Sequence, residues 1–241
     1  MTRSTSLRVI VSVIESMKAI YWIIDYYYDF IGKLLMFTHK NPPKHYLGYV
    51  VKNKAPIILI PGISNKWGFL KRLGDSISML GHPVYVVREL GFNLLDIPQS
   101  AKIVRRIAAQ NNLENAIVVG HSKGGIIGKY FLIHENKDNR IKGVIAIASP
   151  FSGSRIVNHL PGKHFKELAP ESKMVKDMNS NKKINSKIIS IMPEFDNHVW
   201  SEKRSYLDGA LNIMLAVKGH HKIIFDKSSI RKIIELIEKF K

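Results

Sequence analysis

The 241-residue chain contains no cysteine, which excludes a disulfide framework and a thiolate-held zinc site. It also has no long apolar run, because charged residues interrupt residues 7–37, and a membrane-spanning helix needs about 20 consecutive apolar residues. The short apolar stretch 9–14 is closed by Glu15 and has no small-residue cleavage site after it. We therefore expect no cleavable signal peptide and a cytoplasmic protein, either free or peripheral at a membrane.

Acidic residues are scarce relative to basic ones. The 19 aspartates and glutamates face 37 lysines and arginines, giving a formal net charge of +18. This balance favours contact with anionic surfaces such as phospholipid headgroups, although a solvated lysine-rich surface is the alternative. No helix-turn-helix, zinc-finger or RNP-type pattern accompanies the charge, so we expect no nucleic-acid partner.

Cofactor signatures are missing as well. The sequence contains no phosphate-binding loop, no dinucleotide fingerprint and no histidine-rich metal motif. We therefore expect chemistry that uses no cofactor and no metal.

Residues 1–40 predict an amphipathic helical arm. Apolar side chains recur there at steps of three or four, which is the spacing of one helix face. They are Ile10, Ile14, Met17, Tyr21, Ile24, Tyr28, Ile31 and Leu35. This face could pack on the rest of the chain or on a second copy, forming a homo-oligomer. Trp22 and the three tyrosines at 26–28 would also suit an interfacial membrane anchor.

Asn41 and the two prolines after it separate the arm from the rest of the chain. From there to the last residue, the sequence predicts strands that alternate with helices. Apolar runs predict strands at 49–51, 57–60, 84–87, 117–119, 143–148, 188–191 and 212–217. Helical patterns lie at 67–80, 100–110 and from Ser229 onward. The order predicts one α/β domain over residues 41–241, with a mostly parallel sheet covered by helices on both faces. Ligands bind such sheets beyond the carboxyl ends of the strands.

A serine stands at the junction between the strand at 117–119 and a following helix. Gly120, Ser122 and Gly124 form a G-x-S-x-G pattern there. A serine on a sharp strand-to-helix turn needs flanking residues without a Cβ, so that strand and helix can cross closely. The pattern predicts a nucleophilic serine, and the alternative is a glycine-rich turn in which Ser122 only caps the helix.

A nucleophilic serine needs a histidine as base and a carboxylate that orients the histidine. In folds with this turn, the acid follows the serine along the chain and the histidine follows the acid. Asp196 lies after the strand at 188–191, and His220 and His221 lie after the strand at 212–217. The nearby competing acids are Glu194, Asp208 and Asp226.

The chain resembles an α/β-hydrolase, and within that fold it is similar to small bacterial triacylglycerol lipases and esterases with little or no lid. The resemblance runs from about Ala55 to the C-terminus and rests on PIILIPGIS, VVGHSKGGIIGKYFL, IAIASPFSGS and LDGALNIMLAVKGH. It implies His220 as base, Asp196 as acid, and an oxyanion hole made by the N–H groups of Ile63 and Lys123. The role of the Lys123 N–H also follows from the geometry of the turn, because the residue after the serine begins a helix and its N–H is unpaired.

One position departs from the family pattern, because Pro61 stands where a histidine is common. Residues 151–187 occupy the place where this fold inserts a cap. The segment is short, so we expect an open site without a large lid.

The sequence therefore predicts a serine carboxylester hydrolase acting on acyl esters or lipids. An acyltransferase or thioesterase with the same triad is one alternative. A non-catalytic hydrolase-like protein that binds a membrane or a partner is another.

Overall fold

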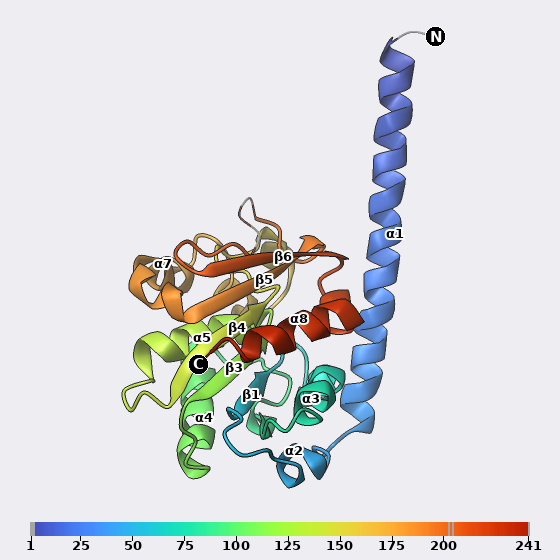
Figure 1. The fold of residues 1–241 in the computed structure, drawn as a ribbon. Helices are drawn as coiled ribbons and strands as arrows, with labels where there is room; N and C mark the ends of the chain where they lie inside the picture. The colour runs from blue at the N-terminus through green and yellow to red at the C-terminus, as the bar shows by residue number, and fades with distance from the viewer. Residues whose placement is uncertain (1–2, 202, 204, 241) are drawn as a thin grey trace.

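Six parallel strands form the centre of the molecule (Figure 1). The computed structural model describes residues 3–201, 203 and 205–240. The strand order is β2-β1-β3-β4-β5-β6, and every neighbouring pair is parallel. The strands are β1 (Ile57–Ile60), β2 (Val84–Val86), β3 (Ala116–His121), β4 (Ile141–Ile147), β5 (Ile188–Phe195) and β6 (Leu211–Lys218).

The central strands are buried on both faces, which explains their uninterrupted apolar sequences. Every residue of β1 and β3 is buried, and the register pairs Ile57 with Ile117 and Ile60 with Gly120. Alternate side chains enter two separate cores. Val118 joins the core on one face, whereas Ile117 and Val119 join the core on the other.

Helices cover both faces of the sheet, as predicted (Figure 1). Apolar residues of α4 (Ile97–Gln110) and α5 (Lys123–His134) form the core that contains Val118. Those of α3 (Lys71–Ser78) and α8 (Lys227–Ile237) form the opposite core. Apart from α1, described below, the other helices of the described residues are short: α2 (His45–Gly48), α6 (Lys163–Lys166), α7 (Lys173–Ser180), and the 3-10 helices η1 (Trp67–Leu70), η2 (Arg88–Leu90), η3 (Arg155–His159), η4 (Lys182–Lys187) and η5 (Lys222–Ile224).

The predicted arm is one long helix, α1 (Arg3–Thr38). Its C-terminal half lies along the body beside η1 and η5, and its N-terminal half extends beyond the body (Figure 1). The packing is close, because a Cβ on Gly32 would lie 2.6 Å from Phe69 Cδ2 and one on Gly68 would lie 2.7 Å from Met36 Cα. The C-terminal half of the arm therefore packs on its own domain. No helix in the described part of the chain is both long and apolar enough to cross a bilayer.

The strand predicted at 49–51 is wrong. The chain forms α2 just before it, and Tyr49 is the C-terminal cap of that helix. Val50 and Val51 are exposed, and the N–H of Val51 bonds to the carbonyl of Gly81 in a single loop contact. These β-branched residues therefore lie at the surface, beside the sheet but not in it.

Residues 151–187, where the sequence predicts a short cap, lie between β4 and β5. The segment holds η3, α6, α7 and η4. Leu160, Phe165 and Leu168 of this segment line the pocket that also contains Ser122, and Leu160 is partly exposed. The cap therefore supplies one wall of the pocket.

Candidate active site

Ser122 stands on a strained turn between β3 and α5. Its backbone angles are φ 53° and ψ −120°, a region that non-glycine residues occupy at a cost of about 1–3 kcal/mol. A Cβ on Gly120 would lie 2.5 Å from Gly125 N, and one on Gly124 would overlap the carbonyl oxygen of Ile60. Both glycines are therefore required for the close crossing that the G-x-S-x-G pattern predicts.

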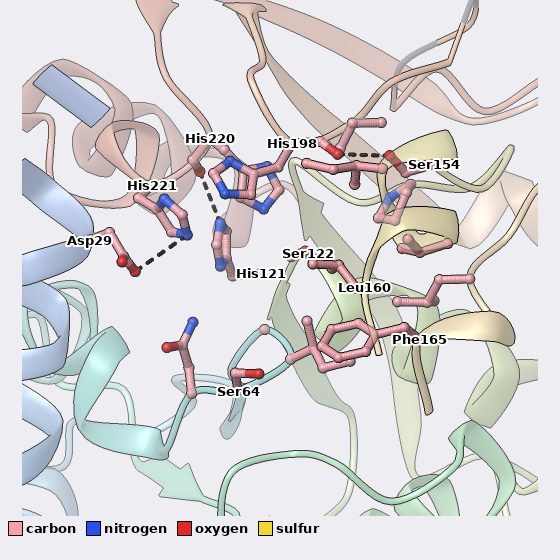
Figure 2. A pocket seen from close by; sticks show the side chains of 18 of the residues that line it. Asp29, Ser64, His121, Ser122, Ser154, Leu160, Phe165, His198, His220 and His221 are labelled. Carbon is pink, nitrogen blue, oxygen red and sulfur yellow. Dashed lines mark hydrogen bonds and ion pairs between the residues drawn. The ribbon is translucent and has the colours of Figure 1, made fainter. Parts of the chain in front are cut away.

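The turn places Ser122 on the wall of a pocket of about 290 Å³ (Figure 2). His220 lines the same pocket, and so do Gly62, Ile63, His121 and His198. Ser122 is half-buried, whereas His220 is almost fully buried. Residues from the ends of β1, β3, β5 and β6 thus meet at one sheet edge, as expected for a parallel sheet.

Asp196 holds the imidazole of His220. The Nδ1 atom of His220 lies 3.0 Å from both carboxylate oxygens of Asp196. Asp196 Oδ1 also accepts the N–H groups of His198 and Val199, at 2.8 and 2.9 Å. The carboxylate therefore holds both the turn after β5 and the ring of His220. Because Asp196 contacts Nδ1, the other ring nitrogen of His220, Nε2, is not used in this contact.

The charges of this pair support each other. Burial alone would raise the pKa of Asp196, but the His220 imidazolium and the two N–H donors lower it below its ordinary value. Burial alone would likewise lower the pKa of His220, and the nearby carboxylates, Asp196 first, raise it above its ordinary value. Protonated His220 is therefore stabilised at this position.

Lys123 and Ile63, the two residues predicted to form the oxyanion hole, lie in the chain segments beside Ser122. Lys123 is the first residue of α5, so its N–H has no acceptor within the helix. Ile63 lines the pocket, and the preceding Gly62 approaches Ser122 so closely that a Cβ there would lie 3.2 Å from Ser122 Cβ. The amide of the buried Asn93 donates to the carbonyl of Pro61 at 2.7 Å and holds this loop in place.

The competing acids lie elsewhere. Asp226 is the N-terminal cap of α8 and accepts the N–H of Ser229. Asp208 is exposed and pairs with Lys182, and Glu194 lies 3.9 Å from Lys218. Among the acids considered from the sequence, Asp196 is therefore the one that contacts His220.

A buried ion pair fixes the residue that follows Ser122. The Nζ atom of Lys123 lies 2.7 Å from Glu167 Oε1 of the cap and donates to the carbonyl of Leu95 at 2.6 Å. Burial lowers the pKa of Lys123, and the nearby Glu167 opposes that shift. The cap is thus tied to the N-terminus of α5. Nothing in the sequence marked Glu167 as the partner.

Further histidines lie around His220, which the sequence did not predict. His121 Nε2 lies 2.9 Å from the carbonyl oxygen of His220, and its pKa is well below the ordinary value because the ring is buried near other histidines (Figure 2). His221 bonds to Asp25 of α1, and His198 lies beside them. Asp25, His198 and His221 are the described residues that could hold a metal ion.

Similar solved structures share this fold. The lipase BlEst2 of Bacillus licheniformis in mature form matches with a TM-score of 0.65 and 15% identity, covering 79% of this chain and 95% of that one. A monoacylglycerol lipase of Paleococcus ferrophilus matches with a TM-score of 0.55 and 16% identity, covering 78% and 96%. An extracellular α/β-hydrolase from a Paenibacillus species matches with a TM-score of 0.53 and 16% identity, covering 77% and 98%.

At these identities the likeness establishes the fold, which is that of the α/β-hydrolases. The predicted fold class is therefore confirmed, and lipases are among the similar structures. No curated protein sequence matches the chain. A model of the PGAP1-like alpha/beta domain family matches residues 97–233, more than half of the chain. The chain belongs to this family.

Proposed function

We propose that the protein is a serine carboxylester hydrolase that cleaves acyl esters through an acyl-enzyme on Ser122. The observation that carries the proposal is the combination of a strained serine on a strand-to-helix turn and a carboxylate-held histidine in the same pocket. The family and the α/β-hydrolase fold support it, because this fold presents a nucleophilic serine at that turn.

In this proposal, Ser122 Oγ attacks the acyl carbonyl while Nε2 of His220 takes the hydroxyl proton. Asp196 holds the Nδ1–H of His220 and stabilises the imidazolium that forms. The N–H groups of Ile63 and Lys123 hold the oxyanion of the tetrahedral intermediate. The intermediate collapses when the C–O bond to the alcohol breaks and His220 returns the proton to the leaving alcohol.

Water completes the cycle. His220 takes a proton from a water molecule, which attacks the acyl group on Ser122. A second tetrahedral intermediate then collapses, Ser122 leaves with the proton from His220, and the carboxylic acid is released. Acyl transfer to another acceptor would use the same steps, with that acceptor in place of water.

Turnover of p-nitrophenyl esters across an acyl-chain series tests this proposal. We expect Ser122→Ala to abolish turnover, while Ser180→Ala, at an exposed hydroxyl of α7, keeps wild-type rates. Full activity in Ser122→Ala would refute the proposal. Product analysis in the presence of a competing alcohol separates hydrolysis from acyl transfer.

We further propose that the pocket mouth faces an anionic lipid surface. Asp29 and Lys33 of α1 line the pocket, and exposed apolar side chains, Phe30 and Leu34, flank them on the same helix. Further exposed apolar side chains follow β2 and lie in the cap: Phe92, Leu94, Leu95 and Leu160. These exposed apolar side chains, together with the net charge of +18, support binding to anionic phospholipid.

Co-sedimentation with phosphatidylserine-containing vesicles tests the surface proposal. We expect binding that weakens with salt and that is lost in the double variant Phe30→Ser, Leu34→Ser. Met79→Ser is the matched control and should bind like wild type. Met79 is an exposed apolar residue at the C-terminal end of α3. Equal binding to neutral and anionic vesicles, or a dimer that the double variant dissociates, would contradict the proposal.

A further inference from the structure

Three side chains from separate segments meet beside the candidate active site. Asp25 comes from α1, His198 from the turn after β5, and His221 from the loop after β6. One ligand atom from each lies within 4.8 Å of the other two. We propose that this cluster, Asp25–His198–His221, binds a divalent transition metal ion, with Zn²⁺ as the first candidate.

The donor set and its spacing fit zinc. Two imidazole nitrogens and one carboxylate oxygen are ligands that Zn²⁺ takes at about 2.0–2.2 Å, often with a fourth position left open. At these bond lengths, a tetrahedral centre separates neighbouring ligand atoms by roughly 3.4 Å. Asp25 Oδ2 lies 2.9 Å from His221 Nδ1 and 3.9 Å from His198 Nδ1, so the two distances from the carboxylate bracket that value, and the histidine nitrogens lie within 4.8 Å of each other. Ca²⁺ and Mg²⁺ prefer oxygen ligands.

His198 provides an independent observation. Its Nδ1 atom is buried and has no hydrogen-bond partner within the described part of the chain. Its distance of 3.9 Å from Asp25 Oδ2 is too long for a hydrogen bond. A buried polar atom of this kind requires an explanation, and a bound cation between the two atoms supplies one.

The surroundings of the cluster are those of a supported metal site. Asp25 is fully buried, and its Oδ1 accepts the N–H groups of His221 and Lys222 at 2.7 and 2.9 Å. These bonds fix the carboxylate and leave Oδ2 facing the histidines. Asp29 Oδ1 lies 3.6 Å from the other ring nitrogen of His221, as in the carboxylate–histidine pairs that orient metal ligands (Figure 2).

A metal ion at this position would join three elements. It would fix the C-terminal half of α1 to the turn that carries Asp196 and to the loop that carries His220. The serine mechanism needs no metal, so binding at this cluster and ester hydrolysis are separate properties that separate measurements can read. The sequence did not indicate the site, because Asp25 is far from both histidines along the chain.

Titration of the full-length, tag-free protein with Zn²⁺ alone tests the inference after treatment with EDTA and dialysis. Calorimetry should give one ion per chain, and Co²⁺ should give the visible absorption of a four-coordinate site. We expect His198→Ala to weaken Zn²⁺ binding by at least 10-fold, and Asp29→Asn by about 10–100-fold. His134→Ala removes an exposed histidine of α5 and should bind like wild type.

Thermal unfolding gives a second readout. Zn²⁺ should raise the Tm of wild type and His134→Ala, and it should leave the Tm of His198→Ala unchanged. Circular dichroism tests whether His198→Ala is folded, and Ser122→Ala should bind Zn²⁺ normally while showing no ester turnover. The inference is overturned if wild type shows no saturable Zn²⁺ binding, or if His198→Ala binds Zn²⁺ as tightly as wild type.

Discussion

The substitution Gly124→Ala tests whether the close crossing of strand and helix sets the catalytic geometry. The new methyl group would overlap the carbonyl oxygen of Ile60 and lie 2.9 Å from its carbonyl carbon and 3.0 Å from the carbonyl oxygen of Pro61. These are backbone atoms, so relief requires α5 to move away from β1. That movement shifts the N–H of Lys123 relative to the N–H of Ile63.

The expected loss of catalytic rate follows from this displacement. A misplacement of about 1 Å can cost about 10²-fold in rate, and loss of one oxyanion donor costs about 10²–10³-fold in kcat. We therefore expect kcat for a p-nitrophenyl ester to fall about 10²-fold in Gly124→Ala, with a smaller change in KM. The overpacking should also destabilise the fold by about 1–3 kcal/mol, measured by urea unfolding.

Gly128→Ala is the matched control on the same helix. Its methyl group would lie 2.9 Å from Val144 Cγ1 and 3.1 Å from Val118 Cγ1, which are side-chain atoms that can shift. The gain in helix propensity of about 1 kcal/mol offsets the crowding, so kcat should stay within a few-fold of wild type. The reasoning is refuted if Gly124→Ala keeps wild-type kcat, or if both variants lose activity equally.

Three further predictions concern buried charges. Asp196→Asn should lower kcat by about 10⁴-fold while the fold remains intact, as steady-state kinetics and circular dichroism would show, and wild-type kcat would contradict the proposed role. Glu167→Ala leaves the buried Lys123 without its ion-pair partner and should lower the free energy of unfolding by about 3–5 kcal/mol. Urea unfolding measures this, and an unchanged midpoint urea concentration would contradict it. Lys129 is buried without a hydrogen-bond partner among the described residues, and burial lowers its pKa to about 8. This shift corresponds to a loss of at most roughly 3 kcal/mol in the free energy of unfolding while the side chain is charged. Because the folded state releases this proton first, wild-type stability should rise relative to Lys129→Met from about pH 8 to pH 10. Lys129→Met should be the more stable protein at pH 7, and the opposite order would be inconsistent with a buried ammonium.

The sequence predicted most of the sheet, because its central strands are apolar on both faces and need no tertiary context to be recognised. The pattern around Ser122 also predicted its own geometry, since only glycine fits at positions 120 and 124. The strand expected at 49–51 failed because Val50 and Val51 are apolar and β-branched but lie exposed at the surface. Local composition does not report burial.

The contacts that surround the site were less accessible from sequence. Asp25 bonds to His221 across most of the length of the chain, whereas the sequence of α1 indicates an apolar packing face and a possible membrane anchor but no polar contact. The pairing of Lys123 with Glu167 likewise depends on how the cap folds back over α5. Such pairs are set by tertiary structure, and no residue spacing along the chain encodes them.

The most direct test of the central claim is labelling of the full-length protein with a fluorophosphonate probe, followed by intact mass measurement and peptide mapping. A nucleophilic Ser122 activated by His220 predicts one adduct per chain, located on Ser122 and missing from Ser122→Ala. Wild-type protein that stays unlabelled, or an adduct that persists in Ser122→Ala, would contradict the account.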